Sequence, residues 1–343
     1  MLALSNTARP PSIADVASLA GVSHQTVSRV LNNHPSVRQL TRARVLAAIE
    51  QLGYRPNPAA RALASGRSKT LGVVAPDTTL YGPASTLSSL QQAAQRAGYF
   101  VSVAAVHSLD RQSVGEAVRR LMSQAVEGLA VITPFTSAHD ALSHLPTGMP
   151  VVAVEGDPDG NMAVVTVDQA TGARLATEHL LAAGHKTVFH VAGPTEWQEA
   201  GGRSAGWRGA LLAAGAEVTP PLSGDWSARS GYEAGQVLAQ IPDATAIFVA
   251  NDDMALGVLR ALHERGRRVP EDVAIVGFDD TPESAYFIPP LSTVRQDFHR
   301  VGRAAVQLLV DQLTTGTSRQ DRVLIDPELI CRQSSMGANR ARS

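Results

Sequence analysis

Short apolar runs alternate with helix-like stretches along most of this 343-residue chain, from about residue 70 onward. Each run is long enough for one buried strand, and the stretches between them carry the spacing of amphipathic helices. Strands that alternate with helices predict parallel sheets joined by right-handed crossovers, and two groups of runs predict two lobes. The expected strands are Leu71–Val74, Phe100–Val106, Leu129–Ile132 and Val151–Val154, then Val188–Ala192, Ala246–Val249 and Val273–Val276.

Length and composition fit a small domain followed by this two-lobed body. Apolar residues make up 44% of the chain and charged residues 18%, as in soluble globular proteins. No apolar run is long enough for a transmembrane helix, and the first residues lack the features of a secretory signal, which favours the cytoplasm. Cys331 is the only cysteine, so neither an intrachain disulfide nor a cysteine-based zinc cluster is expected.

Basic residues gather at the N-terminal end of the chain. Residues 1–70 hold nine arginine or lysine side chains and two acidic ones, a net of +7, while the remaining residues carry a net of −8. Such a division favours a polyanionic partner for the N-terminal segment, although a basic face that is merely solvated gives the same count.

Two short helices joined by a glycine turn are predicted within this basic segment. Ser12–Asp15 has the pattern of a capping box that starts the first helix. Gly21 suits a left-handed C-cap, and Ser23 suits the N-cap of a second helix over His24–Leu31. A third helix is expected over Thr41–Leu52. This arrangement is typical of a helix-turn-helix, whose second helix reads base edges in the major groove.

The segments IADVASLAGVSHQTVSRVLN and GYRPNPAARALASGRSKTLGVV closely resemble the head, hinge and first body strand of the lac repressor (LacI/GalR) family. The resemblance continues through GDWSARSGY, VANDDMALGVLRA, VGFDD and FIPPLSTVRQDF. It implies a DNA-binding transcriptional repressor with a periplasmic-binding-protein-like body that binds a small sugar inducer. It implies no cofactor and no enzyme activity, and no common catalytic or nucleotide-binding motif occurs in the chain.

The resemblance also implies a set of DNA-binding residues. His24 stands where one member of the family has a tyrosine, so the preferred operator is expected to differ at that base. The stretch Asn57–Ala64 would be a hinge helix that inserts Leu63 into the minor groove, although a plain linker fits the same residues. The implied set is His24, Gln25, Ser28, Arg29, Asn32, Asn57, Ala60, Arg61 and Leu63.

Polar residues follow several expected strands, at the end where ligands bind in open α/β sheets. Examples are Glu155 and Asn251, although acids and amides at strand ends also act as simple caps. Matching the family's ligand-binding motifs to this sequence implies a pocket of ten residues. They are Leu80, Gly82, Pro83, Glu155, Arg203, Trp226, Asn251, Asp279, Gln296 and Phe298. The chain departs from the family's ligand-binding motif at two positions, where Glu155 replaces an aspartate and Val167 replaces a phenylalanine. We still expect a galactoside as the ligand, but these two changes leave open which galactoside it is.

The expected domains are a head over 1–56, a hinge and linker over 57–69, and a body over 70–340. The N-lobe would hold about 70–167 and 296–325, and the C-lobe about 168–295 and 326–340. No leucine heptad follows Leu329, so we expect a homodimer on a pseudo-palindromic operator, with no membrane partner. Two alternatives are a corepressor-dependent regulator of the same family and a sugar-binding protein without a DNA function.

Overall fold

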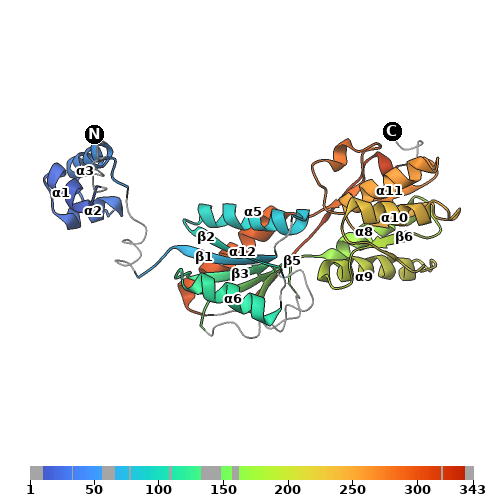
Figure 1. The fold of residues 1–343 in the computed structure, drawn as a ribbon, viewed down its shortest axis with the longest axis horizontal. Helices are drawn as coiled ribbons and strands as arrows, with labels where there is room; N and C mark the ends of the chain where they lie inside the picture. The colour runs from blue at the N-terminus through green and yellow to red at the C-terminus, as the bar shows by residue number, and fades with distance from the viewer. Residues whose placement is uncertain are drawn as a thin grey trace, which may run out of the picture. The chain divides into compact units, whose positions relative to one another are not determined.

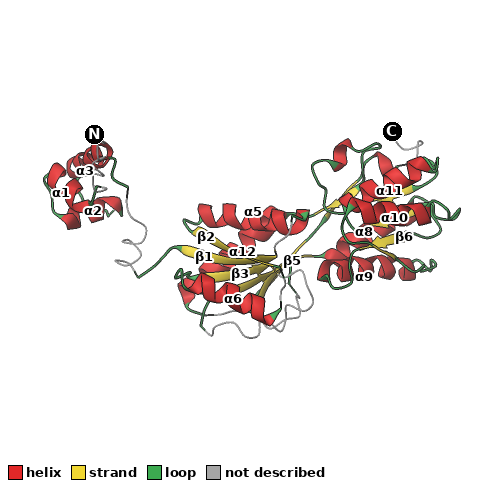
Figure 2. Ribbon diagram, in the orientation of Figure 1, coloured by secondary structure: helices red, strands yellow, loops and turns green. Residues whose placement is uncertain are grey.

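The computed structural model describes residues 11–32, 34–55, 66–76, 79–107, 110–132, 148–156, 162–317 and 320–336. The chain forms two compact units, Met1–Ser68 and Lys69–Ser343. The first is all-helical and the second is α/β, as Figures 1 and 2 show. The predicted fold class, a helical head and an α/β body, is therefore confirmed.

The head contains three helices, α1 (Ile13–Ala20), α2 (His24–Leu31) and α3 (Gln39–Leu52). The predicted capping box is present, because Ser12 N–H donates to Asp15 Oδ2 over 2.8 Å and Asp15 N–H donates back to Ser12 Oγ. Gly21 ends α1 with φ 61°, a left-handed conformation in which glycine has no Cβ penalty.

The start that the sequence predicted for α3, Thr41, is wrong by two residues. The helix begins at Gln39 after Arg38, whose side chain makes no capping hydrogen bond, so no cap residue marked the start. A small apolar core holds the three helices together and leaves one face of α2 toward solvent. This core is Val16, Ala17, Ala20, Val27, Val30, Val45 and Ala48.

The N-lobe of the body is a six-stranded parallel sheet in the order β11-β5-β4-β3-β1-β2. Alternate residues of β1 face opposite sides, so that Val73 packs with α5 and α12 while Val74 packs with α6. Its strands are β1 (Thr70–Pro76), β2 (Phe100–Val106), β3 (Gly128–Ile132), β4 (Val151–Val154), β5 (Ala163–Val167) and β11 (Arg322–Ile325). Its helices are α5 (Tyr81–Arg96), α6 (Arg111–Met122) and α12 (Phe298–Thr315).

The C-lobe is a four-stranded parallel sheet in the order β7-β6-β8-β9. Ile247 faces α10 and α11, and its neighbour Phe248 faces α8 and α9. The strands are β6 (Phe189–Ala192), β7 (Leu222–Ser223), β8 (Ala246–Val249) and β9 (Ala274–Val276). The helices are α8 (Gln169–Ala182), α9 (Gln198–Ala213), α10 (Ala228–Leu238) and α11 (Asp252–Glu264), with short 3₁₀ turns at Ser284–Tyr286 and Gln333–Ser335.

The chain passes between the lobes three times, after β5, before α12 and after β11. The second and third passages pair as antiparallel strands, β10 (Thr293–Arg295) and β12 (Glu328–Ile330). Asp280, after β9, forms ion pairs with Arg295 at 2.7 Å and Arg332 at 2.6 Å, which tie the passages to the C-lobe. No described helix is both long and apolar enough to cross a bilayer.

Candidate functional site

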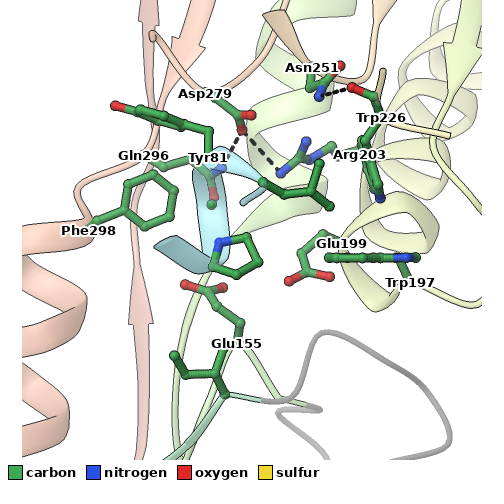
Figure 3. A pocket seen from close by; sticks show the side chains of 14 residues that line it. Tyr81, Glu155, Trp197, Glu199, Arg203, Trp226, Asn251, Asp279, Gln296 and Phe298 are labelled. Carbon is green, nitrogen blue, oxygen red and sulfur yellow. Dashed lines mark hydrogen bonds and ion pairs between the residues drawn. The ribbon is translucent and has the colours of Figure 1, made fainter. Parts of the chain in front are cut away.

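A pocket lies in the body where the carboxyl ends of both sheets meet, as expected for doubly wound sheets. It encloses about 490 Å³ of space, counting the solvent at its mouth, and Figure 3 shows its lining. All ten residues carried over as ligand-binding line this pocket, and both lobes contribute. They are Leu80, Gly82, Pro83, Glu155, Arg203, Trp226, Asn251, Asp279, Gln296 and Phe298.

One wall of this interlobe pocket, here called the Asp279 wall, is built on a closed ring of four side chains, of which Arg203, Asp279 and Gln296 line the pocket. Arg203 Nε donates to Gln169 Oε1 over 2.9 Å, and Gln169 Nε2 donates to Gln296 Oε1 over 2.9 Å. Gln296 Nε2 donates to Asp279 Oδ1 over 2.7 Å. An ion pair of 3.5 Å between Asp279 Oδ1 and Arg203 Nη2 closes the ring, and the dashed lines at Asp279 in Figure 3 mark its last two contacts.

Arg203 is buried, and its charge is compensated from several sides. Its Nη1 donates to the carbonyl of Ala250, and its guanidinium carbon lies 3.9 Å from the ring centroid of Phe278. Burial lowers the pKa of Arg203 and raises the pKa of Asp279 to about 6, with Arg203 opposing the latter shift. At neutral pH the wall therefore holds a guanidinium beside a carboxylate, whose Oδ2 makes no hydrogen bond within the described chain.

Trp226 provides a flat apolar face next to this ring. Its backbone has φ 74°, and Asn251 Nδ2 holds its carbonyl over 3.0 Å. Asn251 Oδ1 meanwhile caps α11 by accepting from Met254 N–H, so Asn251 chiefly positions Trp226. Gly193 leaves the space that the indole occupies, because a Cβ there would overlap the ring.

Glu155 and Glu199, here called the glutamate wall, form another side of the pocket (Figure 3). Glu155 Oε2 accepts from Thr166 Oγ1 over 3.2 Å and from Val167 N–H over 3.5 Å, whereas Glu155 Oε1 and Glu199 Oε2 are buried and have no partner among the described residues. Burial raises the pKa of Glu155 to about 7 and the pKa of Glu199 well above its usual range, with repulsion from Glu155 adding to the latter. Both environments favour a neutral carboxyl.

The remaining lining is apolar and comes mainly from the N-lobe. Phe298, the first residue of α12, meets Tyr81 edge to face with ring centroids 5.9 Å apart. Leu80 packs against the apolar core of the C-lobe and so bridges the lobes.

Five residues of this site are absent from the set that the sequence implied, namely Tyr81, Ile132, Gln169, Trp197 and Glu199. Ile132 ends β3, so its position after an apolar run was a usable signal. Glu199 and Trp197 lie at the start of α9, where an acid normally indicates only a favourable helix dipole.

The head presents the residues implied for DNA contact on the outer face of α2. His24, Gln25, Arg29 and Asn32 are exposed, and Ser28 is half-buried. The four hinge residues of that set, Asn57, Ala60, Arg61 and Leu63, lie outside the described residues. Across the part of the chain that is described, no cluster of three or more histidine, cysteine or acidic side chains is arranged to hold a metal ion.

Comparison with known proteins identifies the family. Residues 12–57 match the model for bacterial regulatory proteins of the lacI family, and residues 177–335 match a periplasmic binding protein-like domain. The chain is 35% identical to the lactose operon repressor of Escherichia coli over 333 residues, which cover 96% of this chain and 92% of that protein.

The chain belongs to the LacI family.

As a member of the LacI family, it is a DNA-binding transcriptional repressor. A solved lac repressor dimer bound to operator and an anti-inducer superposes with a TM-score of 0.87 at 34% identity, covering 96% of this chain and 100% of that one. The relatives differ in effector. The HTH-type transcriptional repressor PurR of Haemophilus influenzae is 36% identical, covering 94% of this chain and 98% of its own length. The HTH-type transcriptional regulator CelR of Thermobifida fusca is 35% identical, and the match covers 95% of this chain and 98% of that protein.

Proposed function

We propose that this LacI-family repressor binds a pseudo-palindromic operator as a homodimer and is released from it by a small neutral sugar. A galactoside is the first candidate, because the sequence is similar to the lactose operon repressor along nearly its whole length. The sugar would occupy the interlobe pocket and stabilise a lobe arrangement in which the two heads no longer fit one operator. It can shift that equilibrium only by its difference in affinity for the two arrangements.

The observation that carries the sugar assignment is the Asp279 wall beside Trp226. A carboxylate oxygen without a partner and a fixed guanidinium offer an acceptor and donors that match neighbouring hydroxyls. Trp226 offers a flat apolar surface for the C–H face of a pyranose ring. Because these groups are already held in place, a sugar does not have to order them on binding.

The charge of the pocket separates this proposal from regulators of anionic effectors. Arg203 is the one cationic side chain among the described lining residues, and it is already paired with Asp279, so a phosphate or carboxylate on the ligand would find no free cation there. A neutral purine, the effector class that the name PurR suggests, fits the charge and could stack on Trp226. The paired hydroxyl-binding groups favour a sugar over this second candidate.

The ligand assignment is tested by titrating the full-length protein with lactose, isopropyl thiogalactoside, galactose, glucose, hypoxanthine and guanine in a calorimeter. The proposal expects binding of at least one neutral sugar and none of the purines. Binding of a purine alone would favour the corepressor alternative.

The DNA-binding role is tested at Arg29, which is exposed on the outer face of α2. Arg29→Ala should cost about 1–3 kcal/mol on a selected operator and much less on random DNA, because arginine discriminates guanine by paired hydrogen bonds. Arg44→Ala, also exposed but on α3, should weaken both complexes about equally. Equal losses from Arg29→Ala on the two DNAs would remove its base-reading role.

For the hinge, we propose that Leu63 is the minor-groove wedge. Leu63→Ala should reduce operator bending in a phasing assay and leave sugar affinity unchanged. The homodimer proposal finds support in Tyr286 and Ile288, which are 86% and 94% exposed although apolar. Light scattering should give a dimer at micromolar concentration, and Ile288→Asp should weaken it.

A further inference from the structure

Asp280, the residue after Asp279, is not part of the interlobe pocket and is held between two arginines instead. Its side chain is 8% exposed. Asp280 Oδ2 accepts from Arg295 Nε over 2.7 Å, and Asp280 Oδ1 accepts from Arg332 Nη2 over 2.6 Å. Arg295 lies on the second passage between the lobes and Arg332 follows β12 on the third, so one carboxylate of the C-lobe holds both passages. These three residues are here called the Asp280 clamp.

The two arginines of the Asp280 clamp are fixed by further contacts. Arg332 Nη1 donates to the carbonyl of Leu291 over 2.8 Å, and Arg295 Nη1 lies 3.3 Å from Glu328 Oε2 on β12. Arg295 and Glu328 also stand opposite each other in the ladder of β10 and β12. Because hydrogen bonds between charged groups are shorter and stronger than neutral ones, the clamp joins β10, β12 and the loop after β9 into one unit.

The clamp is connected to the interlobe pocket through neighbouring residues on both sides. Asp279 and Asp280 are consecutive, and so are their partners Gln296 and Arg295. Gln296 Nε2 donates to Asp279 Oδ1 within the pocket wall (Figure 3). The backbone N–H of Asp279 donates to the carbonyl of Val294 over 2.8 Å. A ligand that binds the carboxylate of Asp279 therefore acts on the same short segments that carry the clamp.

The backbone at this junction has an unusual conformation. Asp279 has φ 108° and Asp280 has φ 52°. Positive φ angles are uncommon outside glycine, and two in succession persist only where the surrounding contacts fix them. Here the contacts are the Asp279 wall for the first residue and the Asp280 clamp for the second. The conformation of the pair therefore depends on both sets of contacts at once.

We propose that Asp280 is a positioning residue that couples sugar binding at Asp279 to the arrangement of the lobes, by holding the second and third passages through its two ion pairs. This rests on the proposed function, in which a sugar changes the lobe arrangement. An element can transmit the effect of a ligand only if its contacts differ in strength between the two arrangements. Both ion pairs of Asp280 are formed in the arrangement described here, and they weaken in the other.

The test measures the coupling factor, which is the ratio of the operator Kd with saturating sugar to the operator Kd without it. Fluorescence anisotropy on the full-length protein gives both values, with isopropyl thiogalactoside, lactose, galactose and glucose each used in turn. Asp280→Asn should reduce the wild-type factor, typically about 5- to 150-fold, by at least about threefold. The variant should still bind the sugar in a calorimeter, because Asp280 does not line the pocket.

Two further variants keep the test independent of any loss of stability in Asp280→Asn. Arg295→Gln changes a side chain that is 47% exposed and should reduce the coupling factor in the same direction. The double variant should lose no more coupling than the Asp280 and Arg332 contacts together provide, so its loss should match that of Asp280→Asn alone. Arg268→Gln is the matched control, because it breaks the 2.8 Å ion pair with Asp272 ahead of β9 and should keep the wild-type factor.

A merely structural role of Asp280 predicts a lower free energy of unfolding with an unchanged coupling factor. That result in both Asp280→Asn and Arg295→Gln would overturn the inference and leave the proposed sugar function standing, because the wild-type protein would still release its operator. If none of the four sugars releases the operator from the wild-type protein, both proposals fail.

Discussion

The two walls of the interlobe pocket differ in how their buried polar groups are satisfied. In the Asp279 wall, four side chains from four separate segments of the chain close a ring of hydrogen bonds and one ion pair. In the glutamate wall, Glu155 and Glu199 each keep a buried oxygen that has no partner in the part of the chain that the structure describes. The ring of the first wall is closed and leaves Asp279 Oδ2 available to a ligand, whereas the second wall contains buried oxygens that no described residue satisfies.

This difference assigns different roles to the two walls. A pre-organised wall lowers the cost of ordering on binding and so provides affinity for a common ring. A wall with unsatisfied groups discriminates, because a ligand that fails to satisfy them leaves their cost in place. The Asp279 wall would therefore bind the sugar, and the glutamate wall would discriminate among ligands that reach the pocket.

The largest expected effect comes from breaking the ring. Arg203→Met removes one partner of a buried ion pair and should destabilise the body by about 3–5 kcal/mol. Urea denaturation followed by tryptophan fluorescence measures this, because Trp197, Trp207 and Trp226 all lie in the body. Arg174→Met, which breaks the exposed pair of Arg174 with Glu178, should cost less than about 1 kcal/mol. Similar costs at the two sites would contradict a structural role for the ring.

A smaller effect is expected in the glutamate wall, and it depends on pH. The pKa of Glu155 rises from 4.5 to about 7 on folding, so its stabilising contribution is complete below pH 4.5 and is lost as the pH rises through 7. Glu155→Gln does not titrate, and its stability relative to wild type should increase over this range by up to about 3 kcal/mol. Glu233→Gln, on an exposed helix face, serves as the control. A difference that stays constant from pH 5 to pH 8 would argue against a neutral Glu155.

The two walls can be compared directly by making the same acid-to-amide change in each and measuring the affinity for sugar. Asp279→Asn should weaken binding of the sugar by about 10- to 150-fold, because a charged acceptor contributes about 1.5–3 kcal/mol. Glu199→Gln should change it by less than about threefold at pH 7, since the environment of Glu199 already favours the neutral form. Calorimetry on variants shown to be folded by their fluorescence gives both numbers. Equal losses would mean that the walls do not differ in charge.

The sequence predicted the fold class and most of the buried strands, because a run such as Leu129–Ile132 is apolar throughout, and β3 is buried along its whole length. It did not mark β5, which is buried along its whole length, or the edge strand β11. It also missed the short strands β7, β10 and β12, which have two or three residues and are fixed by pairing rather than by pattern. The family resemblance placed all ten of its ligand residues around one pocket.

The sequence could not indicate Gln169 or Glu199 as parts of the site. Gln169 is the first residue of α8, and it contributes to the site by hydrogen bonds to Arg203 and Gln296. Both partners are distant in the sequence, so no local pattern points to them. Glu199 looks like an ordinary acid in the first turn of a helix. Glu199 is enclosed beside the carboxyl group of Glu155 only because the two lobes meet at this pocket. No local sequence pattern encodes that arrangement.

The most direct test of the central claim is release of a selected operator, followed by fluorescence anisotropy during titration with sugars. Sugar binding in the interlobe pocket should release the DNA in wild type, and Asp279→Asn should still bind operator but need a much higher sugar concentration. By linkage, saturating operator should weaken sugar binding by the same factor, typically about 5- to 150-fold. Tighter operator binding with sugar, or release that is unchanged in Asp279→Asn, would contradict the account.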